Sequence, residues 1–311
     1  MPLLGSTDLD VFPICLGGNV FGWTADRDES FSVLDAYAAA GGNFIDTADA
    51  YSAFAPGLVG GESETVLGEW LRSRGNRDDM VIATKVGLWD QRSGLSAANI
   101  RAAAEDSLRR LGTDHIDLYY AHTDDRSTPL EETLGTFDEL VREGKVGHIA
   151  ASNYTAPRLA EALSVSDREG LVRYQALQPH YNLVERTDFE GELAELAATE
   201  KLTVLPYYAL ARGFLTGKYR PGDELSESPR SEGARAYLDE HGVKVLAALD
   251  EIATLRGVPM ASVALAWLLG QDAVAAPVAS ARNTEQLAAI LPASRLVLTE
   301  SELNRLSDPS V

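Results

Sequence analysis

The chain has little sulfur and little positive charge. Its 311 residues include one cysteine, Cys15, and three methionines, and 27 lysines and arginines stand against 47 aspartates and glutamates. A single cysteine excludes an internal disulfide and fits a reducing compartment. The net charge of −20 argues against nucleic acid or an anionic membrane surface as a partner, because both would repel so acidic a protein.

Two further absences exclude whole classes of structure. No apolar run approaches the ~18 residues that a membrane-spanning helix needs. The first ten residues, MPLLGSTDLD, have no basic region followed by an apolar stretch, so we expect no signal peptide and a cytoplasmic location. The dinucleotide fingerprint GxGxxG follows none of the apolar runs, which argues against a Rossmann nucleotide site.

What the chain does have is a recurring unit, an apolar run followed by an amphipathic helix. The runs are apolar without alternation, as in strands that are buried on both faces of a parallel sheet. They lie at 11–17, 43–47, 81–86, 116–121, 147–152, 174–178, 202–207 and 273–278. Eight strand–helix units predict a (β/α)8 barrel that spans residues 1–311 as one domain.

The connections between these units carry their own signals. Residues 1–12 have a turn-rich GSTD between short apolar pieces, which predicts a small hairpin on the floor of the barrel. The segments 52–61 and 212–241 predict long loops, the second one mobile, at the end where such barrels bind ligands. Polar starts are expected for four helices, and the residues that give them are Asp28, Ser63, Ser96 and Thr128, the last followed by Pro129 and Glu131.

Polar residues close the apolar runs, at the barrel end where ligands are bound. They are Asn19, Asp46, Lys85, His122, Asn153, Gln178, Tyr207 and Ser280. A lysine in this ring is hard to explain structurally, because an unpaired buried ammonium is costly. An aspartate after a strand is usually a cap, and a histidine there is as often structural as catalytic.

Together, four residues near three successive strand ends make an apparatus for carbonyl reduction. Tyr51 supplies a phenol, a poor acid at neutral pH because its pKa is ~10. The ammonium of Lys85 is expected to lower that pKa, and the carboxylate of Asp46 keeps the ammonium charged. The imidazole of His122 can hold the oxygen that receives the proton.

The sequence also resembles the aldo-keto reductases over nearly its whole length. The matching blocks, in order, are DTADAYS with GGESETVLGEWL, ATKVG, HTDD after DLYYA, GHIAASNY, LQPHYN, LPYYALARGFLTGKY and PVASARNTEQL. The resemblance implies that a reduced nicotinamide delivers a hydride to the carbonyl carbon of a small aldehyde or ketone. It also implies that Tyr51 is the general acid and that His122 orients the carbonyl.

The resemblance further implies a set of cofactor contacts. Ser152, Asn153 and Gln178 would hold the carboxamide, Tyr207 would stack on the nicotinamide ring, and Asn19 and Asp46 would border it. Along the pyrophosphate would lie Ala209, Leu210, Arg212, Gly213 and Lys218. Arg282 would meet the adenosine 2′-phosphate, with Ser280 and Gln286 beside it, which favours NADPH (NADP+) over NADH. The chain departs from the family at Ile290, where an asparagine is usual.

Other interpretations remain open from the sequence. Trp23, Phe54 and Trp89, together with Tyr51 and His122, would line a substrate pocket with an apolar or aromatic wall; for both tryptophans, packing in the core is an equal interpretation. His122, Asp124 and Asp125 would be the ligands if the protein were a metal-dependent hydrolytic barrel. Some relatives of the family are nucleotide-binding regulatory subunits with little turnover. The outer helix faces carry no signal of an oligomeric state.

Overall fold

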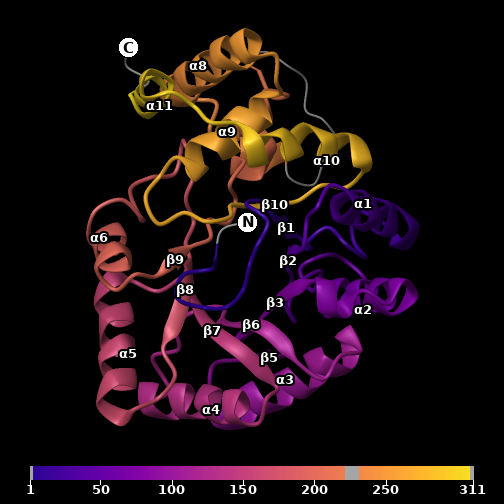
Figure 1. The fold of residues 1–311 in the computed structure, drawn as a ribbon, viewed down its shortest axis with the longest axis vertical. Coiled ribbons are helices and arrows are strands. Elements are labelled where there is room, and N and C mark those ends of the chain that lie inside the picture. Colours follow the sequence, from indigo (N-terminus) through magenta and orange to yellow (C-terminus); the bar gives the residue numbers. More distant parts are fainter. Residues whose placement is uncertain (1–2, 221–230, 309–311) are drawn as a thin grey trace.

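The computed structural model describes residues 3–220 and 231–308 (Figure 1). Eight parallel strands form one sheet in the order β10-β1-β2-β3-β6-β7-β8-β9. Their bounds are β1 Cys15–Gly17, β2 Phe44–Asp46, β3 Val81–Val86, β6 Ile116–Ala121, β7 Val146–Ser152, β8 Tyr174–Gln178, β9 Thr203–Val204 and β10 Val278–Ala279. Each lies within or next to one of the apolar runs of the sequence.

The two edges of this sheet meet, so the sheet is closed. Val204 of β9 forms a parallel bridge with Val274, just before β10. The amide of Val204 donates to the carbonyl of Ala273 over 2.8 Å, and the amide of Ala275 donates to the carbonyl of Val204 over 3.1 Å. The predicted (β/α)8 barrel is confirmed. The last strand, β10, begins only at Val278, the final residue of the predicted run 273–278. The first residues of that run, 273–275, form the seam with Val204 instead.

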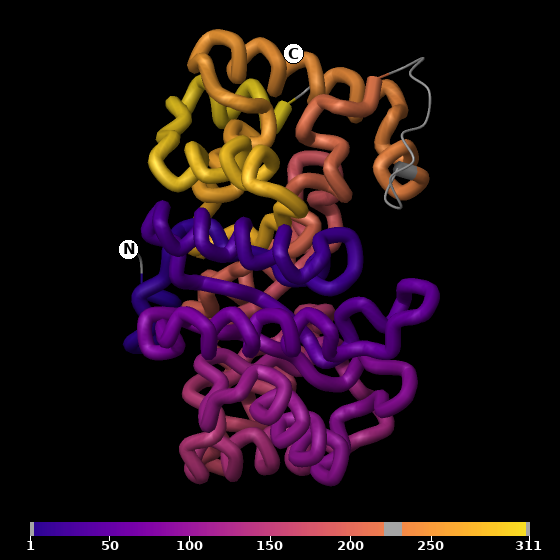
Figure 2. The backbone as a smooth tube through the Cα atoms, turned by 90° about the vertical axis from the view of Figure 1, so that its right-hand side faces the viewer, coloured from indigo at the N-terminus to yellow at the C-terminus, as the bar shows by residue number. Residues whose placement is uncertain are grey.

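Helices surround the barrel (Figure 1). They are α1 Arg27–Ala39, α2 Glu62–Arg74, α3 Ala97–Leu111, α4 Leu130–Arg142, α5 Ala156–Glu169, α6 Glu192–Thr199, α7 Ser231–Arg235, α8 Glu240–Arg256, α9 Met260–Leu269, α10 Thr284–Ile290 and α11 Glu300–Ser307. Short 3-10 turns lie at η1 Arg77–Asp79, η2 Ala211–Thr216 and η3 Leu291–Arg295. Figure 2 shows the C-terminal helices at one end of the molecule and the middle of the chain at the other.

One of the four expected helix starts is confirmed. Ser96 caps α3 by accepting the amide of Asn99. α1 begins two residues earlier than predicted, because Asp26, not Asp28, forms a capping box with Glu29. This arrangement satisfies two orphan donors at once and therefore outcompetes the later aspartate.

The other two predicted caps are wrong, because a tertiary contact uses the hydroxyl of Ser63 and a local contact uses that of Thr128. α2 starts after Gly61, which has φ = 83°, and the Ser63 hydroxyl instead donates to the carbonyl of Gly18 over 2.7 Å. α4 has Pro129 at its cap position without a side-chain cap. The Thr128 hydroxyl donates to Asp125 over 2.7 Å.

Apolar side chains fill both the inside of the barrel and the space between barrel and helices. The inner cluster draws one or two residues from each strand except β9, which Leu205 directly follows, and it includes Cys15, Phe44 and Tyr120. Leu4 and Val11 belong to this inner cluster, and Leu3 forms an antiparallel bridge with Asp10. The predicted N-terminal hairpin on the barrel floor is therefore confirmed, and the first described segment, in indigo, lies over the barrel centre in Figure 1.

The long connections differ from their prediction in detail. The expected loop at 212–241 contains part of η2, all of α7 and the first residues of α8, while 221–230 lies outside the described residues. A hairpin of β4 Leu88–Trp89 and β5 Arg92–Ser93 follows β3; the sequence analysis did not anticipate it.

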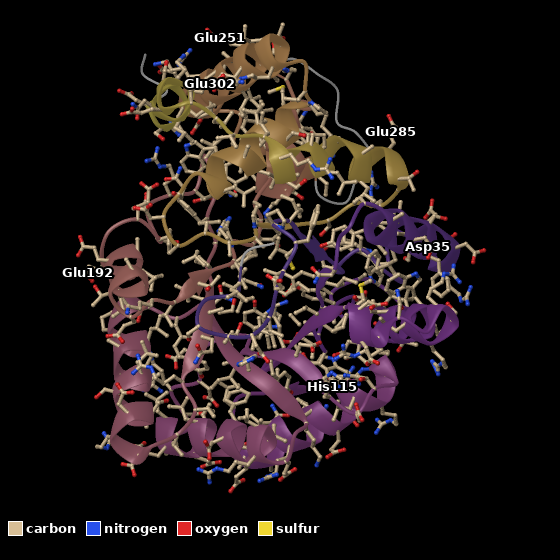
Figure 3. All side chains as sticks on the ribbon, viewed as in Figure 1. Asp35, His115, Glu192, Glu251, Glu285 and Glu302 are labelled. Carbon is tan, nitrogen blue, oxygen red and sulfur yellow. The ribbon has the colours of Figure 1, made fainter. Side chains whose placement is uncertain are left out.

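The outer helix faces carry much of the negative charge. Asp35, Glu192, Glu251 and Glu285 lie at the periphery of the molecule in Figure 3. No single helix in the described part of the chain is long and apolar enough to cross a membrane; α8 and α9 reach that length only as a pair bent by 100°.

Candidate active site

The sheet brings the four predicted catalytic residues to one end of the barrel. β2 pairs with β3, and β3 pairs with β6, all in parallel. The carboxyl ends of these strands therefore lie side by side. Asp46 ends β2, Lys85 lies in β3, His122 follows β6 directly, and Tyr51 lies in the loop after β2.

The Lys85 ammonium connects three of these elements. Its Nζ donates to Asp46 Oδ2 over 2.5 Å, to the carbonyl of Thr47 over 2.8 Å and to the hydroxyl of Tyr51 over 2.9 Å. The side chains of Lys85 and Asp46 are both completely buried. All three ammonium protons thus have partners, which offsets the cost of burying the charge.

The phenol of Tyr51 is a weaker acid than was predicted from the sequence. Its hydroxyl lies 3.1 Å from Asp46 Oδ2 as well as 2.9 Å from Lys85 Nζ. Burial, followed by the charge and hydrogen bond of Asp46, raises the pKa of Tyr51 well above its usual value. The predicted lowering is wrong for this state, because Asp46 offsets the positive charge of Lys85 and burial disfavours the phenolate. The site therefore holds a protonated phenol.

His122 faces this phenol. Its ring lies edge-on to that of Tyr51 with 6.0 Å between centroids and an interplanar angle of 71°. Burial, and then the charge of Lys85, lowers the pKa of His122 well below its usual value. The imidazole is therefore neutral, and its Nδ1 is buried without a hydrogen-bond partner among the described residues.

A hydrogen-bonded chain of polar side chains extends from the ion pair across β7, β8 and β9. Gln178 Nε2 donates to Asp46 Oδ1 over 2.9 Å, and the Ser152 hydroxyl donates to the carbonyl of Gln178 over 2.9 Å. Asn153 Nδ2 donates to the carbonyl of His122 over 2.9 Å, and Tyr207 donates to Asn153 Oδ1 over 2.8 Å. These predicted cofactor residues thus form one network with the catalytic four.

Residues 13–309 match the model of the Aldo/keto reductase family. The chain belongs to this family. Norsolorinic acid reductase stcV of Emericella nidulans is 34% identical over 99% of this chain and 79% of its own length. The oxidoreductase YrpG of Bacillus subtilis is 34% identical over 98% and 94%, and Protein tas of Escherichia coli is 32% identical over 96% and 93%.

Family membership settles the reaction class. This aldo/keto reductase is an NAD(P)H-dependent oxidoreductase, and its chemistry is carbonyl reduction, as predicted from the sequence. The nicotinamide cofactor supplies a hydride. The protein must supply a proton donor, a flat surface for the ring and cations for the phosphates.

The segment predicted to follow the pyrophosphate has an unusual backbone. Ala211, Arg212 and Gly213 have φ values of 47°, 57° and 94°. Left-handed conformations are costly for residues other than glycine, and they persist where a functional site needs them. A Cβ at Gly213 would lie 3.1 Å from Lys218 Nζ, so this ammonium lies directly against the strained turn. The strained turn and the Lys218 ammonium therefore fit a pyrophosphate. In the same segment Ala209 is buried and Leu210 is half-buried.

The predicted adenosine end lies between β10 and α10. The Ser280 hydroxyl donates to Asn19 Oδ1 over 2.8 Å, which joins the ends of β10 and β1. Gln286 accepts the backbone amide of Arg282 over 3.0 Å, and the Arg282 side chain is half-buried. Ile290 is 3% exposed and packs in the core.

Two of the three predicted substrate-wall aromatics are in contact. Trp23 and Phe54 meet edge to face with 4.8 Å between centroids, and Phe54 is 61% exposed. Trp89 Nε1 donates to the carbonyl of Val59 over 3.0 Å. Trp89 therefore supports the loop that carries Phe54.

The two carboxylates of the alternative metal site at HTDD are hydrogen-bonded to other groups of the protein. Asp124 accepts from Arg158 Nε over 2.8 Å. Asp125 accepts the amide of Leu95 over 2.7 Å and the hydroxyls of Ser127 and Thr128. Both carboxylates are engaged in folding the loops, and no group of three potential metal ligands occurs among the described residues.

Several residues of this region were not predicted from the sequence. Tyr120 points into the barrel, and Lys85 Nζ lies 5.4 Å from the centre of its ring. His180 stacks on Tyr207 with 5.2 Å between centroids. Asp49 and Glu64 are buried carboxylates beside the catalytic strand. The acidic residues within DTADAYS and GESE were the available signals, because a carboxylate inside a core segment needs a reason.

Proposed function

We propose that this aldo/keto reductase reduces an aldehyde or ketone to the alcohol with NADPH, reversibly, and that Tyr51 supplies the proton. The observation that carries the proposal is the Lys85 ammonium, whose three protons go to Asp46, the Thr47 carbonyl and Tyr51. Such a buried arrangement has no structural purpose that a hydrophobic residue would not serve as well. It does hold one phenol in a fixed position.

The division of roles follows from the charges. Tyr51 is protonated, so it can donate to an oxygen on which negative charge develops. Lys85 then stabilises the phenolate that remains, and Asp46 keeps Lys85 oriented. His122 is neutral, and its ring faces that of Tyr51. It can therefore donate a hydrogen bond to the same substrate oxygen without competing for the proton.

We expect the substrate pocket to take carbonyl compounds with an apolar or aromatic body. Trp23 and Phe54 form an aromatic pair, Phe54 lies in the loop that follows Tyr51, and indole and phenyl faces favour aromatic partners. The names of three of the relatives, norsolorinic acid reductases of Emericella nidulans and two Aspergillus species, agree with a reductase of this kind.

Fluorescence titration with NADPH and NADH, followed by turnover of aromatic and aliphatic aldehydes and ketones, tests the proposal. We expect micromolar NADPH binding, much weaker NADH binding, and oxidation of NADPH with aromatic carbonyl compounds. A protein that binds neither nucleotide contradicts the proposal. A protein that binds NADPH tightly and turns over no carbonyl compound is better described as a nucleotide-binding regulator.

The cofactor preference gives a sharper prediction. Replacing Arg282 by alanine should weaken NADPH binding about tenfold or more and leave NADH binding within about twofold, because a charge-assisted contact to the 2′-phosphate is worth roughly 1.5–3 kcal/mol. The measurement is the dissociation constant of each nucleotide by tryptophan quenching. Arg72→Ala is the matched control, since Arg72 is an exposed arginine of α2. Equal loss of both nucleotides would place Arg282 elsewhere than at the 2′-phosphate.

A further inference from the structure

A second group of buried charges lies beside the catalytic strand. Glu64, in the first turn of α2, has a completely buried side chain. Its Oε1 accepts from the Thr84 hydroxyl over 2.6 Å, and its Oε2 accepts from Arg110 Nε over 2.6 Å. Thr84 immediately precedes Lys85 in β3, and Arg110 belongs to α3. Glu64 thus links the strand that carries the catalytic lysine to a neighbouring helix.

Arg110 extends this link to the end of the loop 52–61. Its guanidinium lies 5.9 Å from the centre of the Trp89 ring, and Trp89 Nε1 donates to the carbonyl of Val59 over 3.0 Å. A Cβ at Gly60 would lie 2.9 Å from Trp89, and a Cβ at Gly61 would lie 2.6 Å from Arg110 Cδ. The backbone of the loop therefore rests directly on these two side chains, with no room for a side chain between them.

Asp49 lies beside the same network, and its carboxylate has no partner. The residue is 0% exposed, and both carboxylate oxygens lack a hydrogen bond within the described residues. Burial, followed by the charge of Glu64, raises the pKa of Asp49 to about 7, although Arg110 and Arg92 oppose the change. The titratable or charged groups that face Asp49 are Glu64, Lys85, Arg92, Arg110 and Tyr119.

The charges that act on Arg110 differ between the two protonation states of Asp49. When Asp49 is neutral, Glu64 is the carboxylate that Arg110 pairs with, beside the Ser107 hydroxyl. When Asp49 is ionised, its charge repels the carboxylate of Glu64 and attracts the guanidinium of Arg110, as it does that of Arg92, so Asp49 and Glu64 compete for Arg110. Competition at Arg110 weakens the support under Gly61 and Trp89. The loop end is therefore firmest at the acid side of neutrality.

We propose that Glu64 and Arg110 are positioning residues for the loop 52–61, and that protonation of Asp49 sets how firmly they hold it. The loop carries Phe54 and begins next to Tyr51, so its position affects the fit of the substrate. This inference rests on the proposed carbonyl reduction for its kinetic consequence. Its structural consequence, a pH-dependent loop, is independent of substrate and cofactor.

The kinetic test compares wild type with Asp49→Asn between about pH 6 and pH 8.5, on both sides of the titration. The KM of the wild type for the carbonyl substrate should rise by a factor of about five with pH, the equivalent of one lost hydrogen bond. In Asp49→Asn it should stay at the low-pH value, because the amide cannot ionise. The titration of Asp49 should change KM more than kcat, since Asp49 is not proposed to contact the substrate and reaches Lys85 only through its charge. Asp78→Asn, which removes an exposed carboxylate from η1, should retain the wild-type rise.

Hydrogen exchange supplies the readout that does not need activity. Amides of residues 52–61 are compared between wild type and Asp49→Asn at each pH, without cofactor or substrate, so that intrinsic exchange rates cancel. We expect equal protection at pH 6 and severalfold faster exchange in the wild type at pH 8.5. Glu64→Gln should accelerate exchange at both pH values and raise KM more than it lowers kcat.

Equal exchange of wild type and Asp49→Asn across the range would overturn the inference, and so would a KM rise that persists in Asp49→Asn. A protein that reduces no carbonyl compound but shows the exchange difference would refute the proposed function and leave the loop mechanism in place.

Discussion

Replacing Tyr51 by phenylalanine should lower kcat for carbonyl reduction by a factor of about 10³, within the range that a positioned general acid contributes. The change removes one oxygen, the phenolic oxygen to which Lys85 donates a hydrogen bond. The ring remains, so the edge-on contact with His122 and the position of the loop should persist. Dissociation constants for NADPH should change less than about threefold, because the phenol is not proposed to bind the cofactor tightly.

The matched control removes a buried phenolic hydroxyl elsewhere in the same barrel. Tyr154 and Tyr174 share a hydrogen bond of 3.2 Å on the far side of β7 and β8, so Tyr154→Phe should keep near-normal turnover. Near-normal turnover of Tyr51→Phe would show that another group donates the proton.

Replacing Asp46 by asparagine should destabilise the fold by about 3–5 kcal/mol, the cost of leaving one member of a buried ion pair without its partner. Lys85 would remain buried with two neutral acceptors, the carbonyl of Thr47 and the hydroxyl of Tyr51. Its pKa, which burial already lowers against the opposing charge of Asp46, should fall further. The measurement is the free energy of unfolding from denaturant titration at pH 7.

Two comparisons isolate the buried charge as the cause. Asp28→Asn breaks an ion pair with Arg27 whose carboxylate is 91% exposed, and it should cost less than about 0.5 kcal/mol. The double variant Asp46→Asn with Lys85→Met removes both charges and should regain more than half of the loss, since the penalty belongs to the unpaired ammonium. A loss of under 1 kcal/mol in Asp46→Asn alone would mean that water or another group neutralises Lys85.

The strand ends of the barrel were predictable from the sequence because two signals agree there. A buried parallel strand is apolar throughout, and Lys85 or His122 at its end breaks that pattern. The hairpin on the barrel floor was predictable for the same reason, since a turn sequence separates two apolar pieces. The four catalytic residues follow from these boundaries, because parallel strands place their carboxyl ends together.

Other features depend on contacts that no local pattern records. The Ser63 hydroxyl was expected to cap a helix, but it donates to the carbonyl of Gly18, which is distant in the sequence. The direction of the Tyr51 pKa could not be foreseen, since it depends on whether burial and Asp46 outweigh Lys85. Asp49 and Glu64 lie in segments whose acidic residues were an available signal, but their burial beside Arg110 is visible only in the fold.

The closure of the barrel between β9 and β10 has a consequence for how the chain completes its fold. The seam consists of a two-residue strand and the bridge between Val204 and Val274, segments about seventy residues apart in the sequence. Joining distant segments costs chain entropy before any contact repays it. The ring should therefore close last and open first, so that the amide of Ala275 at the seam exchanges by local opening while those of β6 require global unfolding.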